Sequence, residues 1–171
     1  MRRRALLVSV PLVVSGCTAV DDTGGPSPET VTTTAVAVDC EAVERPPVAA
    51  DDADEVEPRP YPGAPDDVPL IEWVIEHERA YVTNRLLAEH TVTAITGIGV
   101  EERTTEQRPA GTVVRFQYSY GFETDDYIAD SPLVTAAYYV TEQGALRATN
   151  SGGEFAADLD PTVEGNPVVC F

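Results

Sequence analysis

The sequence predicts an α+β fold in which one N-terminal helix packs on a curved four-stranded antiparallel sheet. Apolar residues recur at helical spacing between residues 69 and 89, and the period changes to two after His90. From Val114 to Phe122, large apolar residues alternate with polar ones, as in a strand with one buried face. The helix therefore precedes the strands, and one aromatic strand face is available to receive it.

The helix is expected from about Pro69 to Glu89. Aspartates precede Pro69, and an acid near the cap with proline in the first turn is typical of a helix start. One stripe of the predicted helix holds positions 71, 74, 75, 78, 82, 85, 86 and 89. Its polar members are Glu78, Arg85 and Glu89. Arg85 and Glu89 stand at i and i+4, and we expect a surface ion pair there; the alternative is a partly buried polar cluster, with Glu78, at the helix–sheet junction.

Four strands are expected after the helix. They cover about 92–100, 114–122, 131–140 and 146–149. Gly97 and Gly99 indicate a bulge or a sharp bend in the first strand. In the second strand the aromatic residues point one way, whereas Arg115, Gln117 and Ser119 point the other.

This element order resembles that of the cystatin-like and NTF2-like α+β folds. The resemblance covers about residues 66–150 and rests on element order alone; a small split β-sandwich is the alternative. It implies a cavity between helix and sheet, for which the candidate lining residues are Trp73, Phe116, Tyr118 and Tyr120. Some NTF2-like enzymes pair an acidic base with a Tyr donor in such a cavity. Plain core packing requires the same alternation, and we prefer that interpretation.

The N-terminus has the layout of an export signal. Three arginines precede an apolar run from Ala5 to Ser15, which is too short to span a membrane. The arginines also resemble a twin-arginine signal, so the export route, Tat or Sec, stays open. The last residues before Cys17 are Val-Ser-Gly, which resembles the lipobox of bacterial and archaeal lipoproteins. The resemblance implies cleavage before Cys17 and a lipid anchor on its thiol.

Charge and composition exclude some functions. The chain has 171 residues, 29 acidic and 11 basic side chains and a net charge of −18; all its basic residues are arginine. Nucleic-acid binding needs a basic footprint, so we expect none. The acidic residues are scattered, which favours a solvated surface. This acid-rich, lysine-free composition resembles that of secreted lipoproteins of halophilic archaea, and high salt would screen its self-repulsion.

The chain is expected to divide into four parts. Residues 1–16 form the signal peptide, 17–39 a lipid-anchored flexible tether, 40–69 a Pro-rich acidic extended segment and 70–171 the α+β domain. If Cys17 carries lipid, Cys40 and Cys170 remain as an even pair in an oxidising compartment. We therefore predict a disulfide between them.

Residues for catalysis or metal binding are sparse. The histidines, His77 and His90, would point about 220° apart on a helix, so they cannot share a metal. We expect His77 on the solvated face and His90 at the helix C-terminus. Asp158, Asp160 and Glu164 do not have the spacing of an EF-hand. No nucleophile, zinc-ligand or P-loop motif occurs. The sequence predicts no cofactor, no metal and no catalytic residue.

These observations predict a lipid-anchored protein on the extracytoplasmic face of the cell membrane. Its function would be that of a non-catalytic interaction or envelope-associated module with an unknown partner. The alternatives are a small-ligand-binding module with a helix–sheet cavity and, third, an NTF2-like enzyme. A sealed core would favour the interaction module, and a cavity with convergent polar groups would favour the small-ligand module.

Overall fold

The computed structural model describes residues 36–48, 56–66 and 68–171, which belong to one unit, Thr33–Phe171. The predictions for the signal peptide, for lipidation of Cys17 and for most of the tether lie outside the described residues. Within the described residues, no helix is both long and apolar enough to cross a membrane.

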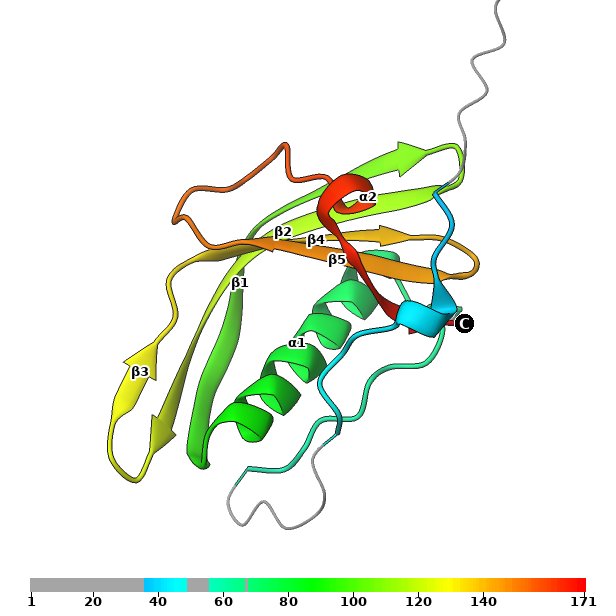
Figure 1. Ribbon diagram of the computed structural model, residues 1–171. Helices are drawn as coiled ribbons and strands as arrows, with labels where there is room; N and C mark the ends of the chain where they lie inside the picture. Colours follow the sequence, from blue (N-terminus) through cyan, green and yellow to red (C-terminus); the bar gives the residue numbers. More distant parts are fainter. Residues whose placement is uncertain (1–35, 49–55, 67) are drawn as a thin grey trace, which may run out of the picture. The chain divides into compact units, whose positions relative to one another are not determined.

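The α+β class with one main helix is confirmed, but the antiparallel sheet has six strands instead of four (Figure 1). A helix, α1 (Leu70–Glu89), packs on one face of this sheet. The strands are β1 (Val92–Arg108), β2 (Gly111–Thr124), β3 (Ile128–Asp130), β4 (Val134–Val140), β5 (Gly144–Asn150) and β6 (Asn166–Cys170). Two short helical segments, η1 (Cys40–Ala42) and α2 (Pro161–Glu164), complete the fold. The strand order is β1-β2-β4-β5-β6, and β3 pairs with β2 outside this path.

The strands missing from the prediction are β3 and β6. The three residues of β3 are too few to show an alternating pattern. β6 contains Pro167, and proline in a short run argues against a strand, although an edge strand tolerates it. β6 lies at one edge of the sheet, so Pro167 is compatible with its being a strand.

The first hairpin is longer than predicted. β1 continues through Arg108 because its polar residues from Arg103 to Gln107 pair with β2 while remaining exposed. Polar exposed residues carry no period that distinguishes a strand from a loop. The register shifts between Thr96 and Gly99, so the predicted irregularity near Gly97 is confirmed.

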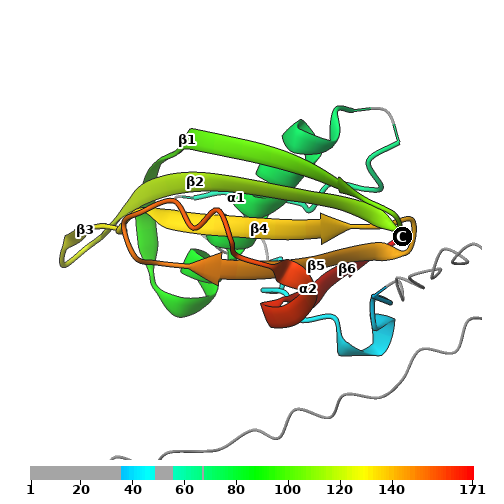
Figure 2. The same cartoon turned by 90° about the horizontal axis from the view of Figure 1, so that it is seen from above.

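Both faces of the sheet are covered, whereas the sequence suggested one buried face. Every residue of β4 is buried. The face away from α1 is covered by the segment before α2 and by Val38, which packs on Val113, Tyr139 and Leu146. Arg115, expected on the open side, is 5% exposed and donates from Nε to the Leu159 carbonyl at 2.8 Å. Figure 2 shows α2 beside β5 and β6 in the view from above.

The disulfide between Cys40 and Cys170 is confirmed; its Cα atoms are 5.8 Å apart, and the two cysteines are separated by 130 positions in sequence. It fixes η1 to the end of β6. From there residues 43–48 and 56–66, here called the strap, run along the side of α1 away from the sheet (Figure 1). Asn84 of α1 holds the strap by accepting from the Arg59 amide and donating to its carbonyl.

Because the strap covers this side of α1, the prediction that His77 faces solvent is wrong. His77 is fully buried, 5.1 Å from the Tyr61 ring and 5.3 Å from the Trp73 ring between centroids. The helix is thus buried over a wider arc than one apolar stripe predicts.

Candidate functional site

The four residues proposed to line a cavity all lie between α1 and the sheet. Trp73 on α1 is 2% exposed and donates from its indole to the Gly63 carbonyl of the strap. Phe116 and Tyr118 on β2 are 0% and 1% exposed. Tyr120, further along β2, is half-buried and accepts a hydrogen bond from Arg85 at 2.7 Å. Side chains fill the space around the first three, and solvent does not reach it.

A polar cluster lies at the centre of this interior. Its members are His77 and Glu78 of α1, Tyr118 of β2, Tyr138 of β4 and Arg147 of β5, together called the polar core. Arg147 binds both Glu78 carboxylate oxygens, from Nε and from one terminal nitrogen, each at 2.7 Å. The hydroxyls of Tyr118 and Tyr138 each donate to one of the same oxygens. The fully buried carboxylate therefore accepts four hydrogen bonds.

These contacts determine the charge state of Glu78. Burial alone would raise the pKa of this carboxyl, because a charged group loses its hydration. The charge of Arg147 and the donors around the carboxylate outweigh burial and lower the pKa of Glu78 to about 2. Burial and the negative charge of Glu78 raise the pKa of both tyrosines above the usual value. The polar core is therefore a fixed ion pair with two neutral phenols.

His77 extends the polar core toward the strap. Since the Tyr138 hydroxyl donates to Glu78, His77 Nδ1 must donate to Tyr138, 3.1 Å away. His77 Nε2 is then a bare acceptor, buried without a hydrogen-bond partner among the described residues. Burial lowers the pKa of His77 to about 4, although the charge of Glu78 acts in the opposite direction. The ring is therefore neutral.

Glu78 is unsuited to acid–base work, and its contacts instead join separate elements of the fold. A general base needs a carboxylate that can reach substrate and take a proton near neutral pH. Glu78 has no exposed surface, and its lone pairs are already engaged. Its ion pair with Arg147 joins α1 to β5 across 69 residues of sequence.

The sequence analysis did not identify Arg147 or Tyr138. A signal was present: a glutamate on an apolar helix stripe requires a buried cation, and Arg147 occupies an alternating apolar strand. The predicted surface pair of Arg85 with Glu89 is wrong for the described residues, where Arg85 instead donates to Tyr120. The alternative, a partly buried polar cluster, is closer to the structure, because Glu78 lies buried in the polar core.

An open cleft lies at the end of the sheet where the C-terminus emerges. Its volume is about 840 Å³. We call it the end groove; it is lined by Val36, Ala37, Ala64, Pro65, Asp66, Pro109, Ala110, Gly111, Val140, Thr141, Glu142, Gln143 and Phe171. The walls come from five separate parts of the chain. The two turns, β1–β2 and β4–β5, and the C-terminus lie at the same end in both ribbon views (Figures 1 and 2).

The walls of the end groove are held in place by defined contacts. Phe171 packs edge-on against Trp73, with ring centroids 5.5 Å apart, and its amide donates to the Gln143 carbonyl. A Cβ on Gly111 would lie 2.4 Å from the Val140 carbonyl oxygen, so glycine permits this close approach of the turn to β4. The disulfide and the buried Val38 fix the two walls contributed by the chain ends.

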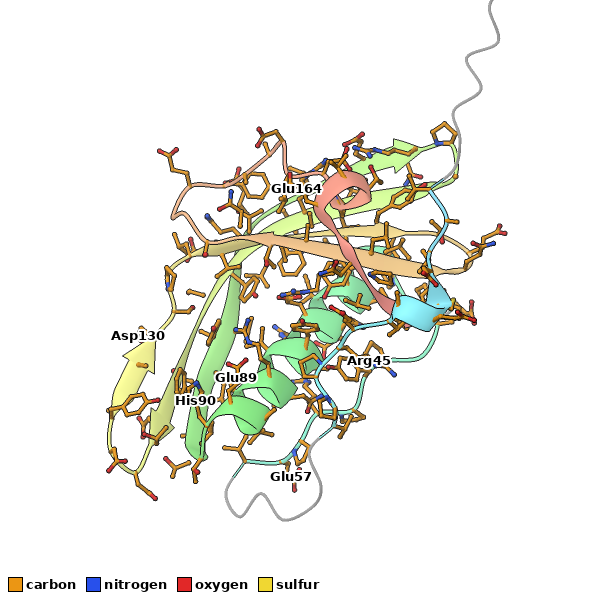
Figure 3. The ribbon with its side chains drawn as sticks, in the orientation of Figure 1. Arg45, Glu57, Glu89, His90, Asp130 and Glu164 are labelled. Atoms are coloured by element: carbon orange, nitrogen blue, oxygen red, sulfur yellow. A yellow bond between two sulfur atoms is a disulfide. The ribbon has the colours of Figure 1, made fainter. Side chains whose placement is uncertain are left out.

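Two smaller clefts lie elsewhere. One, of about 580 Å³, lies between the strap, α1 and β1, and its two arginines, Arg59 and Arg79, share the carboxylate of Glu76. The other, of about 360 Å³, lies near Asp130 at the β3 end of the sheet. Figure 3 shows Asp130, the last residue of β3, at that end.

Metal-binding groups do not gather in the described residues: no three His, Cys, Asp or Glu side chains lie close enough there to hold a metal ion. Asp160 caps α2 by accepting from the Thr162 amide, and it also pairs with Arg108. Asp160, one of the three acidic residues compared with an EF-hand, is therefore engaged in contacts within the protein.

Comparisons with known proteins gave no match. No family model fits the chain, and neither a curated protein nor a solved structure is detectably similar to it.

Proposed function

We propose that this protein is a lipid-anchored lipoprotein of the extracytoplasmic membrane face, related to small lipoproteins of halophilic archaea, which binds a partner without catalysing a reaction. The anchor is proposed from the lipobox-like residues before Cys17. The observation that carries the binding role is the contrast between the two candidate sites. The interior is filled and its carboxylate fully bonded, whereas the end groove is open and largely apolar.

The end groove has the features of a binding surface. Its volume lies in the range of about 300–1,000 Å³ that is usual for ligand sites. Val36 and Phe171 are 37% and 42% exposed, so large apolar side chains meet solvent there. Exposed apolar surface that is held in one shape favours association, because little conformational freedom is lost on binding.

The alternative of a small-ligand module uses the same cleft and differs only in what fills it. An NTF2-like enzyme would need a substrate to reach an acid and a tyrosine hydroxyl together. In the polar core these groups meet, but Glu78 is fully buried and ion-paired. The binding module is therefore the better supported function.

Two measurements test the proposal. Intact mass of the protein from native membranes should show a lipid on Cys17 and loss of residues 1–16, and Cys17→Ser should move the protein to the soluble fraction. A photo-cross-linking residue at Gln143, in the end groove, should capture one discrete partner. The same residue at Glu164, on α2 in Figure 3, is the matched control. Equal capture at both positions would contradict a binding role for the end groove.

A further inference from the structure

We propose that the end groove binds an apolar protein segment that carries arginine or lysine side chains. This inference rests on the proposed binding function and adds the chemistry of the partner. Three properties of the end groove lead to it: the sign of its charges, their freedom from ion pairs, and the rigidity of its walls.

The end groove is lined by apolar residues together with Asp66, Thr141, Glu142 and Gln143, and its charged groups are all acidic. Asp66 and Glu142 are exposed carboxylates, and none of the thirteen lining residues is basic. Elsewhere in the described residues, arginines neutralise several carboxylates, including Glu76, Glu78, Glu106 and Asp160. No ion pair within the described residues involves Asp66 or Glu142. Both are therefore free to meet a cation on a partner.

The net negative charge of the chain distinguishes between three possible occupants of the groove: a second copy, a membrane surface and a basic partner. A second copy would bring another chain of net charge −18 against the same carboxylates, and like charges oppose that contact. An anionic membrane surface is disfavoured for the same reason. A basic partner is attracted by the whole chain and finds two unpaired carboxylates at the groove itself.

The walls give this site a fixed shape. The β4–β5 turn is closed by the Thr141 amide donating to the Gly144 carbonyl, and by the Gln143 amide donating to the Thr141 hydroxyl. Phe171 is held by its amide and by Trp73, as described above. Apolar side chains of the partner would pack between Phe171 and the Pro109–Gly111 turn, while its basic groups reach Asp66 and Glu142.

A pair of labelled synthetic peptides tests the chemistry. The first is Arg-Leu-Trp-Leu-Arg, and in the second glutamate replaces both arginines. Binding to the full-length protein is followed by fluorescence anisotropy at a salt concentration where circular dichroism shows it folded. We expect the basic peptide to bind about tenfold or more tightly than the acidic one.

Variants locate the binding. Ala110→Trp, which fills the groove, should weaken binding of the basic peptide about tenfold or more. The double variant Asp66→Asn/Glu142→Gln should remove most of the preference for the basic peptide. Its matched control, Asp125→Asn/Asp126→Asn, changes the net charge equally in the exposed β2–β3 turn and should retain the preference. Circular dichroism of each variant establishes that it is folded.

Several results would overturn the proposal. Equal effects of the two double variants would show a general charge attraction, and a folded Ala110→Trp protein with unchanged affinity would place the peptide elsewhere. A dimer in light scattering that Ala110→Trp dissociates would identify a second copy as the occupant. Groove-dependent binding to neutral phosphatidylcholine vesicles would identify lipid. If the peptides fail but cross-linking at Gln143 still captures a partner, the binding module stands and only its partner chemistry is wrong.

Discussion

Replacing Arg147 with methionine tests the role of the polar core most directly. The substitution keeps an unbranched apolar stem but leaves the Glu78 carboxylate buried without its cation. Removing one partner of a buried ion pair costs about 3–5 kcal/mol of unfolding free energy. The pKa of Glu78, about 2 against an ordinary 4.5, corresponds to about 3 kcal/mol at neutral pH. The two values therefore predict a similar loss of unfolding free energy.

The matched control is Arg79→Met. Arg79 pairs with Glu76, but these side chains are 35% and 43% exposed. Exposed pairs contribute about 0–1 kcal/mol, so this variant should be nearly as stable as the parent. Urea unfolding in constant high salt, followed by circular dichroism, measures both variants without changing the ionic strength.

The pH dependence gives a second readout. In the parent, the stability from Glu78 is present above about pH 4.5 and is lost as the pH falls toward about 2, because the folded-state pKa is lowered. Without Arg147, burial dominates and raises that pKa, so Glu78 takes up a proton on folding. Stability of Arg147→Met should then increase as the pH falls toward the new pKa. A loss below 1 kcal/mol with an unchanged pH profile would refute the argument.

Three further predictions follow from the structure. Burial lowers the pKa of His77 to about 4, so the unfolding free energy contributed by its neutral ring is present above about pH 6.5 and is lost as the pH falls to about 4. His77→Phe should therefore flatten the dependence of unfolding free energy on pH in that window, as measured by urea unfolding. Reduction of the Cys40–Cys170 disulfide should lower the unfolding free energy by about 4–5 kcal/mol in the chain-entropy model, measured in the same way with and without reductant. Dialysis into low salt should remove far-UV circular dichroism signal, and return to molar salt should restore it. The reason is that the Debye length of about 3 Å at 1 M salt screens the repulsion between the acidic side chains. A melting curve independent of salt would contradict this.

The sequence predicted those features that have a local period. The helix was placed within one residue of α1, and the aromatic alternation of β2 located the packed face. Cysteine parity predicted the disulfide. Each of these signals depends on residues close in sequence, or on a simple count.

Features that depend on tertiary contacts escaped the prediction. The burial of His77 follows from the strap, which has no helical or strand period and lies on α1 through Asn84 and Trp73. Arg147 meets Glu78 through tertiary structure: β5 lies beside β4 in the sheet, and its Arg147 reaches a helix residue 69 positions earlier in the chain. The end groove has no local signature at all, since its walls come from five separate segments.

The Cys40–Cys170 bond also changes how proteolytic damage to this protein would be seen. Almost all of the described residues lie inside the covalent ring that it closes. A single cut by a protease anywhere in that ring opens it but releases no fragment. The two pieces would remain joined and migrate together until a reductant separates them.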